Sequence, residues 1–440
     1  MIEQFHQIMQ KIYKLISTLK LKYNCNIVFD TRLLRENDIF IGLKTKNKNG
    51  SLYYKDAIKK KASLIIIDLK INQPNLIYIK NTQIFVKNFC EFILDSYKGK
   101  IIAITGSVGK TTYKENIYHI LKNNSFKTYR SFKNYNNIQG LQFSIMNMNI
   151  QTDYSVFELG INNSNEMGKL VKTLKPHYSL VTCIEDTHIG NFRNFRHLID
   201  NKLKIFNSNR LIAGFINYNY DPNYIKNRIS SKIQLLNVEN IKKSSLKTKK
   251  IYTIDFTKSH KKYKIQSSRG NFYENIAIIS FLFLAKIIKK FKFNNFFYEE
   301  SVIESRGRKV SALIGKKKVN FYDHSYNACP YSLNKQILIF NERKINQKVY
   351  ILGSMKELGK KSKYYHMKII QLVSDLSLKN IIFIGDEFYK LKIRNTNYKF
   401  YKNYKPVVKH LNKQINSIKN IFVMGSRSNQ LYRVIKKYVR

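Results

Sequence analysis

Apolar and polar positions alternate in short blocks over the first hundred residues. Four apolar runs are separated by polar segments, and apolar positions near Tyr54–Lys61 follow a helical spacing. The apolar runs are Ile27–Phe29, Ile39–Leu43, Leu64–Ile67 and Leu76–Ile79. Short apolar runs bounded by polar residues are typical of buried strands. The pattern predicts a small N-terminal α/β domain over residues 1–98, with a linker in the segment DSYKGK at residues 95–100.

A regular order of strand, loop and helix begins at Ile101. Its segments are Ile101–Thr105, Thr111–Leu121, Tyr154–Leu159, Leu180–Cys183 and Leu211–Asn217, with a later helix at Asn275–Lys289. Such alternation predicts a parallel sheet with helices on both faces. We expect this block to form a central domain over residues 99–305.

The last block, residues 306–440, repeats the same alternation. Its expected strands are Asn320–Asp323, Val349–Leu352, Ile381–Ile384 and Ile421–Met424. A chain of 440 residues is long enough for three separate cores. We therefore expect an α/β protein of three domains, with a phosphate-binding loop in the central parallel sheet and a Rossmann-like C-terminal domain.

The segment AITGSVGKTTYKE joins the first strand of the central block to a helix. The common P-loop pattern needs a glycine at position 104, where this chain has Ile104, so only a shorter loop remains. Its residues are Gly106, Ser107, Val108, Gly109, Lys110, Thr111 and Thr112. The glycines let backbone N–H groups turn toward an anion at the start of a helix. Lys110 adds a cation for phosphates, and Thr111 offers a hydroxyl to Mg²⁺.

Two further side chains follow neighbouring strands of the expected sheet. Glu158 ends one strand in FELGINNSNEMGKL, and His188 lies just past the next strand in LVTCIEDTHIGNF. Ligands of open parallel sheets bind at the carboxyl ends of strands. Glu158 could therefore reach a Mg²⁺ ion held by Thr111, although a solvated glutamate or a structural histidine would give the same pattern.

Three polar segments could line a ligand site, or could be turns only. NYNNIQG at residues 134–140 contains Asn137, and SRGRKV at residues 305–310 contains Arg306 at a domain junction. YDHSYNACP at residues 322–330 runs from a strand into a loop. Its residues Asp323, Ser325 and Asn327 could face a ligand from the third domain.

The charge balance is strongly basic, at +51. Nucleic-acid binding would explain the lysines. However, the lysines are spread over the whole chain, and Asn, Ile, Tyr and Phe are abundant as well. These residue types share A/T-rich codons, so we favour compositional drift and expect no nucleic-acid partner. A positive field would still attract small polyanionic substrates.

The cysteines and the N-terminus indicate an ordinary cytoplasmic protein. Cys25, Cys90, Cys183 and Cys329 form no CxxC pair, so the sequence shows no metal or disulfide signature. The N-terminal segment has charges throughout and lacks the apolar core of a signal peptide. The longest apolar stretch, near residues 276–285, is too short to span a bilayer. We expect a monomer without membrane insertion.

Taken together and in this order, the motifs resemble those of the Mur ligases, ATP-dependent amide-forming enzymes of bacterial cell-wall synthesis. The similar segments are TGSVGKTT, NYNNIQGL, FELGINNSNEMGKL, TCIEDTHIGNF, YDHSYNACPYSL and ILGSMKELGKKS, and DTRLLRENDIFIGLK resembles an N-terminal uridine-nucleotide domain. The resemblance covers nearly the whole chain. Within the family it points to the member that joins D-alanyl-D-alanine to UDP-N-acetylmuramoyl-tripeptide.

The resemblance also implies roles for individual residues. The loop with Lys110 would hold ATP, and Thr111, Glu158, His188 and Lys202 would hold Mg²⁺. Lys202 falls where the family carries a lysine modified to a carbamate. Catalytic roles would fall to Lys110, Lys202 and His188. Binding positions would be Asn275, Arg306 and Asp323 for ATP, and Thr31, Arg32, Asn137, Ser325 and Asn327 for the substrates.

Some positions depart from the family pattern, and other functions stay open. Asn271, Phe272, Ser354, Cys329, Lys204 and Met424 replace residues usual in the family. The phosphate and metal positions are intact, so we expect activity. The alternatives are a sibling ligase that adds a single amino acid, a basic nucleic-acid-binding ATPase, and an inactive remnant.

Overall fold

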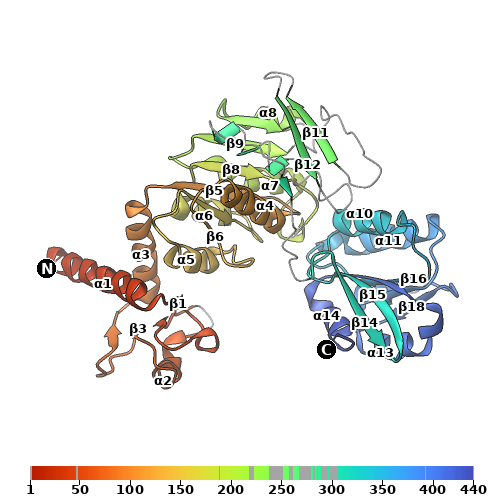
Figure 1. Ribbon diagram of the computed structural model, residues 1–440, viewed down its shortest axis with the longest axis horizontal. Helices are drawn as coiled ribbons and strands as arrows, with labels where there is room; N and C mark the ends of the chain where they lie inside the picture. The colour runs from red at the N-terminus through yellow and green to blue at the C-terminus, as the bar shows by residue number, and fades with distance from the viewer. Residues whose placement is uncertain are drawn as a thin grey trace.

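The computed structural model describes most of the chain as three lobes, each built on a sheet (Figure 1). The described residues are 2–45, 48–187, 189–217, 222–236, 251–256, 261–266, 279–280, 283–284, 286–288, 296–297, 305–391 and 393–439. None of the helices in these ranges is both long and apolar enough to cross a membrane.

The N-terminal lobe has a four-stranded parallel sheet in the order β1-β2-β3-β4. Its strands are β1 (Ile27–Val28), β2 (Ile39–Ile41), β3 (Leu64–Ile67) and β4 (Leu76–Tyr78), and its helices are α1 (Ile2–Tyr23), α2 (Tyr54–Lys59) and α3 (Thr82–Ser96). All four predicted strands and the short helix are confirmed. The expected linker is wrong at both ends, because α3 continues to Ser96 and the next strand begins at Lys100.

The central lobe has a six-stranded, fully parallel sheet in the order β10-β9-β8-β5-β7-β6. Its strands are β5 (Lys100–Thr105), β6 (Thr128–Arg130), β7 (Tyr154–Glu158), β8 (Tyr178–Val181), β9 (Ala213–Asn217) and β10 (Ile233–Leu236). Its helices are α4 (Lys110–Asn123), α5 (Ile138–Met146), α6 (Glu166–Leu174), α7 (Phe195–Leu203) and α8 (Pro222–Lys226). Strands β11 (Ile251–Phe256), β12 (Lys261–Gln266) and β13 (Phe296–Phe297) form a separate small sheet.

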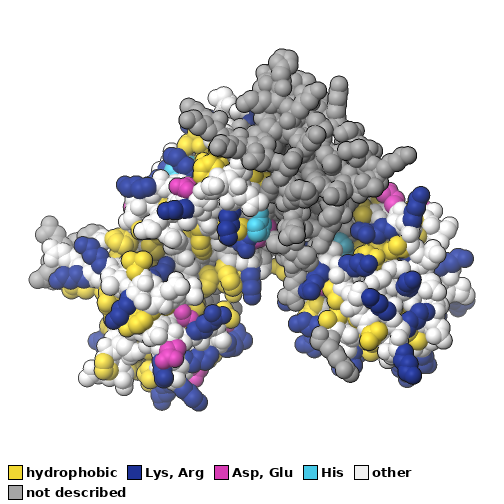
Figure 2. All heavy atoms as spheres, viewed as in Figure 1, with side chains coloured by type: hydrophobic (Ala, Val, Ile, Leu, Met, Phe, Trp, Pro, Cys, Tyr) yellow, Lys and Arg dark blue, Asp and Glu magenta, His cyan; other side chains and the backbone are white. Residues whose placement is uncertain are grey.

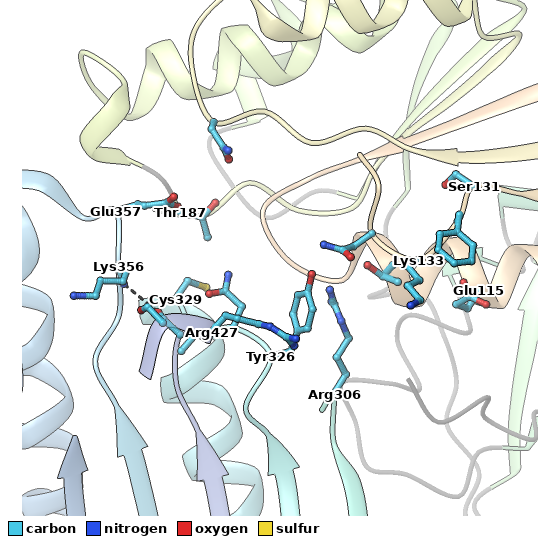
Figure 3. Close-up of a pocket in the computed structure, with 18 of the residues that line it drawn as sticks. Glu115, Ser131, Lys133, Thr187, Arg306, Tyr326, Cys329, Lys356, Glu357 and Arg427 are labelled. Atoms are coloured by element: carbon cyan, nitrogen blue, oxygen red, sulfur yellow. Dashed lines mark hydrogen bonds between the residues drawn. The ribbon is translucent and has the colours of Figure 1, made fainter. Parts of the chain in front are cut away.

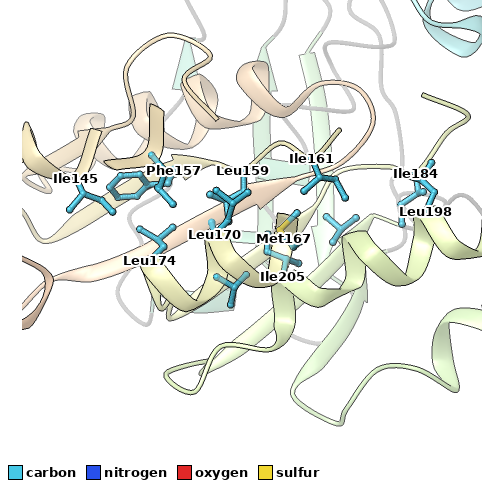
Figure 4. Packing of buried hydrophobic residues seen from close by; sticks show 14 of the residues in the cluster. Ile145, Phe157, Leu159, Ile161, Met167, Leu170, Leu174, Ile184, Leu198 and Ile205 are labelled. Carbon is cyan, nitrogen blue, oxygen red and sulfur yellow. The ribbon is translucent and has the colours of Figure 1, made fainter. Parts of the chain in front are cut away.

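Both faces of the central sheet are covered, as the sequence predicts. Ile102 and Ile104 of β5 pack with α4 in one core, whereas Ile101 and Ala103 face the opposite core. On that opposite side, apolar residues of β7, α6 and α7 interlock (Figure 4). The predicted helix at 275–289 lies largely outside the described residues. Those of its residues that are described at 279–280, 283–284 and 286–287 are helical.

The C-terminal lobe has a six-stranded sheet in the order β14-β15-β19-β16-β17-β18, parallel except for the β14–β15 pair. Its strands are β14 (Arg308–Ile314), β15 (Lys317–His324), β16 (Lys348–Gly353), β17 (Ile381–Ile384), β18 (Tyr398–Tyr401) and β19 (Asn420–Met424). Helices α10 (Pro330–Asn341), α11 (Ser362–Asp375) and α12 (Asp386–Lys390) pack on one face. Helices α13 (Lys405–Lys413) and α14 (Tyr432–Lys436) pack on the other (Figure 1).

The N-terminal lobe is fixed to the central lobe by specific contacts. The Asn147 side chain accepts a hydrogen bond from Ile27 N at 2.8 Å and donates one to Ile27 O at 2.9 Å. Lys20 donates from Nζ to the carbonyl oxygen of Met146. Burial lowers the pKa of Lys20 to about 8. The Asn147 hydrogen bonds satisfy polar groups of β1, which has no other strand on that side, and together with the Lys20 contact they join the two lobes.

Candidate active site

The predicted strand, loop and helix are confirmed at residues 100–123. β5 ends at Thr105 and α4 begins at Lys110. Gly106 has φ of +150°, and a Cβ there would lie 2.0 Å from Thr182 Oγ1. Gly109 has φ of +83° and precedes the first turn of α4. Both positions need glycine, and the loop therefore presents backbone N–H groups at a helix N-terminus, as an anion site requires.

The Lys110 side chain folds back over this loop. Its Nζ donates to Gly106 O at 2.9 Å and to Ser107 O at 3.2 Å. Burial lowers the pKa of Lys110, the Glu158 carboxylate opposes that shift, and Arg306 adds to it. The Lys110 ammonium is thus held beside the loop by two carbonyl groups, and it lies close enough to Arg306 for the two positive charges to interact.

Glu158 reaches the loop directly. Ile104 pairs with Glu158 and Thr105 pairs with Val181, so the carboxyl ends of β5, β7 and β8 meet at one edge. Thr111 Oγ1 donates to Glu158 Oε2 at 2.6 Å, and Asn136 Nδ2 donates to Glu158 Oε1 at 2.8 Å. Thr111 and Glu158 are both buried. The Thr111 hydroxyl and the Glu158 carboxylate are therefore in contact, as the sequence predicts.

Lys202, in α7, contacts the same loop at Gly106 through its side chain, although the two residues are 96 positions apart in the sequence. Its side chain is buried, and its Nζ donates to Gly106 O at 3.1 Å. Burial, followed by the charge of Lys110, lowers the pKa of Lys202 to about 7. The two lysines share one carbonyl acceptor. Near neutral pH a substantial fraction of Lys202 is therefore the neutral amine.

The structure describes no cluster of three or more His, Cys, Asp or Glu side chains, within its described ranges, that could hold a metal ion. Mg²⁺ usually takes one or two carboxylates and completes its shell with water and substrate phosphates. The Thr111–Glu158 pair fits that requirement. His188 and Asn275 lie outside the described residues.

The segment after β8 links the phosphate loop to the C-terminal lobe. Ser107 Oγ donates to Glu185 O at 2.9 Å and accepts from Glu185 N at 2.8 Å. The next residue, Asp186, accepts a hydrogen bond from the Tyr365 hydroxyl of α11. Gly190 N donates to Glu357 O at 3.1 Å. The loop and the C-terminal lobe are thus connected by a short run of hydrogen bonds.

Gly190 and Gly359 meet where the two lobes touch, and this contact can be tested. A Cβ on Gly190 would lie 2.7 Å from Gly359 N and 2.9 Å from Gly359 Cα. We expect Gly190→Ala to push the lobes apart and to lower kcat/KM by roughly tenfold, because small displacements at a reacting centre are costly. Steady-state kinetics measure this loss.

Gly168 provides the control for that substitution. It lies in α6, and a Cβ there would meet nothing within 4 Å. Gly168→Ala should leave the kinetics unchanged. Equal kinetics for Gly190→Ala and the wild type would show that the contact does not set the position of the lobe.

The C-terminal lobe contributes four of the predicted residues. Asp323 is the second-last residue of β15. Its Oδ1 accepts hydrogen bonds from Ser325 N at 2.9 Å and from Ser325 Oγ at 2.6 Å, in the turn that follows the strand. Asp323 and Ser325 are buried, whereas Asn327 is exposed and lines the space between the lobes. Arg306 places its guanidinium carbon 3.9 Å from the centre of the Tyr326 ring.

Two adjoining cavities lie between the central and C-terminal lobes, where Figure 2 shows the molecule hollowed. The inner cavity, of about 260 Å³, contains the phosphate loop, Glu158, Asn136 and Arg306. The outer cavity, of about 1050 Å³, has a wall rich in charged residues (Figure 3). Those charged residues are Glu115, Arg130, Lys133, Arg306, Lys356, Glu357 and Arg427. The cations of the inner cavity could bind a triphosphate, and the excess of cations over carboxylates in the outer cavity could bind a larger anionic substrate.

Other predicted residues lie elsewhere. Asn137 accepts from Gly140 N at 2.9 Å and caps α5, while its neighbour Asn136 faces Glu158. Thr31 is buried in the N-terminal lobe, and its carbonyl accepts from Lys60 Nζ at 2.6 Å. Arg32 is exposed and paired with Asp30 at 2.7 Å. Thr31 and Arg32 line neither cavity.

The sequence reasoning missed Lys114, a fully buried lysine of α4. Its Nζ donates to Ser131 O at 2.8 Å and to Lys133 O, and lies 3.4 Å from Glu115 Oε1. It therefore holds the 131–134 segment against α4, at the edge of both cavities. In the sequence, the one feature that could have identified Lys114 is its position one helical turn after Lys110, and that spacing is ordinary in a helix.

Cys329, one of the positions expected to depart from the pattern of the resemblance, lies at the N-cap of α10. Its Sγ accepts from Ser332 N at 3.5 Å. Burial raises the pKa of the thiol, so it stays neutral and is a weak acceptor. We expect Cys329→Asn to stabilise the protein by about 0.5–1 kcal/mol, because asparagine is among the best N-cap residues.

Thermal unfolding followed by circular dichroism measures that gain. Ser332→Ala, which removes the reciprocal partner, should lower the melting temperature in both backgrounds. A melting temperature that falls on Cys329→Asn would contradict this role.

Comparison with known proteins agrees with this architecture. A sequence profile described as the Mur ligase middle domain matches residues 104–284. The chain is 27% identical to the UDP-N-acetylmuramoyl-tripeptide–D-alanyl-D-alanine ligase of Rickettsia prowazekii, over 94% of this chain and 95% of the relative. It is 30% identical to the Borreliella burgdorferi protein of the same name, over 78% and 75% of the two chains.

Solved structures agree with the fold. MurF from Acinetobacter baumannii superposes with a TM-score of 0.78 at 19% identity, covering 94% of this chain and 92% of that one. MurF from Thermotoga maritima, solved with ADP, gives 0.76 at 20% identity over 93% and 96%. The three-lobed arrangement, the glycine loop over Glu158 and the match along most of the chain lead to one assignment: the chain belongs to the Mur ligase family.

Proposed function

We propose that the chain is an ATP-dependent ligase that joins D-alanyl-D-alanine to UDP-N-acetylmuramoyl-tripeptide, a step in making the peptidoglycan precursor. We further propose that it acts as a monomer in the cytoplasm. The observation that carries the proposal is the convergence of Lys110, Thr111, Glu158 and Lys202 on one glycine loop, beneath cavities that the C-terminal lobe completes. The names of the relatives supply the substrates.

The proposed reaction has two steps. The terminal carboxylate of the tripeptide attacks the γ-phosphorus of ATP, so an acyl phosphate forms and ADP leaves. The free amine of the dipeptide then attacks the acyl carbon, and phosphate leaves as the amide forms. The protein contributes positioning and charge neutralisation, because it forms no covalent bond itself.

The residues around the glycine loop have separate roles in this scheme. The loop N–H groups and Lys110 bind and neutralise the phosphates, while Arg306 approaches the same region from the other lobe. Thr111 and Glu158 would hold Mg²⁺, with Lys202 as a carbamate adding a further anionic ligand. The ion would reduce the repulsion between a carboxylate and a triphosphate.

Water must be kept away from an acyl phosphate, and the contacts between lobes serve that need. The Tyr365–Asp186 hydrogen bond and the Gly190–Gly359 contact hold the C-terminal lobe against the segment that touches Ser107. Glycine at both positions lets the backbones approach closely, so the two lobes are in contact beside Thr187 and Glu357, which line the outer cavity.

Phosphate release from ATP tests the proposal against its rivals. Purified protein is given ATP, Mg²⁺ and UDP-N-acetylmuramoyl-tripeptide, together with D-alanyl-D-alanine, single amino acids or duplex DNA. We expect release only with the dipeptide. Release with one amino acid would identify a sibling ligase, and stimulation by DNA would identify a nucleic-acid-dependent ATPase. No release in any arm would identify an inactive remnant.

The scattered basic side chains favour the ligase over the nucleic-acid enzyme. Lysine and arginine are distributed over the face in Figure 2 and do not gather in one stripe. A nucleic-acid groove needs clustered cations that follow the phosphate backbone. Any DNA binding should accordingly be weak and disappear at physiological salt.

A further inference from the structure

Tyr326 lies between two arginines that come from distant parts of the C-terminal lobe. The guanidinium carbon of Arg306 is 3.9 Å from the ring centre, and that of Arg427 is 5.8 Å from it. Arg306 lies two residues before β14, whereas Arg427 begins the short helix η7 (Arg427–Asn429) after β19. Figure 3 shows the two arginines approaching Tyr326 from different sides.

The position of Tyr326 is set by the turn that follows β15. Ser325 is tied to Asp323 through two hydrogen bonds, of 2.6 and 2.9 Å, and Tyr326 N donates to Ser305 O at 3.2 Å. Gly307 N donates to Asp323 O at 2.6 Å. The backbone on both sides of Arg306 is therefore bound to the segment that carries the ring.

The two arginines serve different spaces. Arg306 lines both cavities and lowers the pKa of Lys110, so its charge acts on the phosphate loop. Arg427 lines the outer cavity only. Its guanidinium carbon also lies 5.1 Å from the centre of the Tyr432 ring. Tyr326 lines both cavities and forms part of the wall between them.

An aromatic ring between two guanidinium groups suits both of them. Each cation is attracted to the π face, and arginine stacks on aromatic rings more readily than lysine does. The ring also keeps the like charges apart and restricts long side chains that would otherwise sample many rotamers. Removing the ring would take one stacking contact away from each arginine.

We propose that Tyr326 is a positioning residue that holds Arg306 toward the phosphates of ATP and Arg427 toward an anionic group of the substrate in the outer cavity. The assignment of ligands rests on the proposed function. The contribution comes from the ring, and the hydroxyl is dispensable. One side chain thereby couples the geometry of the nucleotide site to that of the acceptor site.

Two substitutions separate the ring from the hydroxyl. Tyr326→Phe should keep kcat and both KM values within about twofold of the wild type, because the π face is retained. Tyr326→Leu should raise KM for ATP and for the substrate of the outer cavity, each by roughly tenfold. Tyr78→Leu is the matched control, since Tyr78 also lies under a lysine, Lys70, but is exposed in the N-terminal lobe.

A double-mutant cycle shows whether Tyr326 acts through the arginines. In an Arg306→Ala background, Tyr326→Leu should no longer raise KM for ATP. In an Arg427→Ala background, it should no longer raise KM for the second substrate. ADP binding measured by calorimetry should show the same loss of effect for the Arg306 pair, independently of ligation.

Additive losses in both cycles would overturn the proposal, as would a Phe variant as impaired as the Leu variant. These results are distinguishable from failure of the proposed function. If the wild type released no phosphate with the dipeptide, the substrate assignment would fall, while the ADP-binding cycle would still test the link between Tyr326 and Arg306.

Discussion

Lys110→Ala is expected to lower kcat/KM for ATP-dependent ligation by about 10²–10³-fold, the usual cost of removing a preorganised charge from a transition state. Among the residues that the structure describes, the lysine donates hydrogen bonds to the carbonyl groups of Gly106 and Ser107 alone, so the fold should survive its loss. Phosphate-release kinetics give the activity, and thermal unfolding gives the stability.

Lys122→Ala is the control for that substitution, because Lys122 is an exposed lysine in the last turn of the same helix. It should be indistinguishable from the wild type in both measurements. Near-normal turnover of a folded Lys110→Ala protein would remove the loop from the mechanism.

Lys202→Ala is expected to lower activity by roughly 100-fold, and acetate or formate should partly restore it. A free ammonium beside Lys110 and a metal ion would add a third cation and repel the metal. A carbamate supplies oxygen ligands instead, and it forms only from the neutral amine. The lowered pKa, about 7, makes that amine available near neutral pH. The short acid would occupy the space that the carbamate leaves.

Lys204→Ala provides the comparison, since Lys204 binds Asn201 Oδ1 at 3.1 Å and Asn165 Oδ1 at 3.3 Å, away from the loop. It should keep full activity and show no response to acetate. Full activity of Lys202→Ala without added acid would refute the role of Lys202. Intact-mass spectrometry under bicarbonate, which detects the added carboxyl group, reads the modification without reference to turnover.

Much of the fold could be predicted because its strands are short, fully apolar runs. β3, β5, β17 and β19 are buried on both faces, and their sequences indicate this directly. Two strands of the C-terminal sheet were not predicted. β14 is half exposed, and β18 alternates buried Tyr398 and Phe400 with exposed Lys399. Edge strands carry a weaker hydrophobic signal, particularly in a lysine-rich chain.

The site was predictable where sequence neighbours share a loop, and less so where the fold brings distant residues together. Gly106 to Thr112 could be identified from spacing alone. The hydrogen bond from Lys202 to Gly106 spans 96 residues, and only the resemblance to a family pointed to it. Choosing between Asn136 and Asn137 depended on which one caps α5, and that depends on where the helix begins. The stacking of Arg306 on Tyr326 needed the β14–β15 pairing, which the sequence pattern did not reveal.

The central claim is that the glycine loop activates a carboxylate by phosphoryl transfer. Isotope transfer tests it most directly. UDP-N-acetylmuramoyl-tripeptide labelled with ¹⁸O in its terminal carboxylate is converted with unlabelled ATP and D-alanyl-D-alanine, and the released phosphate is analysed by mass spectrometry. An acyl phosphate intermediate predicts one ¹⁸O atom in each phosphate released. Phosphate that carries no label, with the dipeptide joined to the product, would contradict the account.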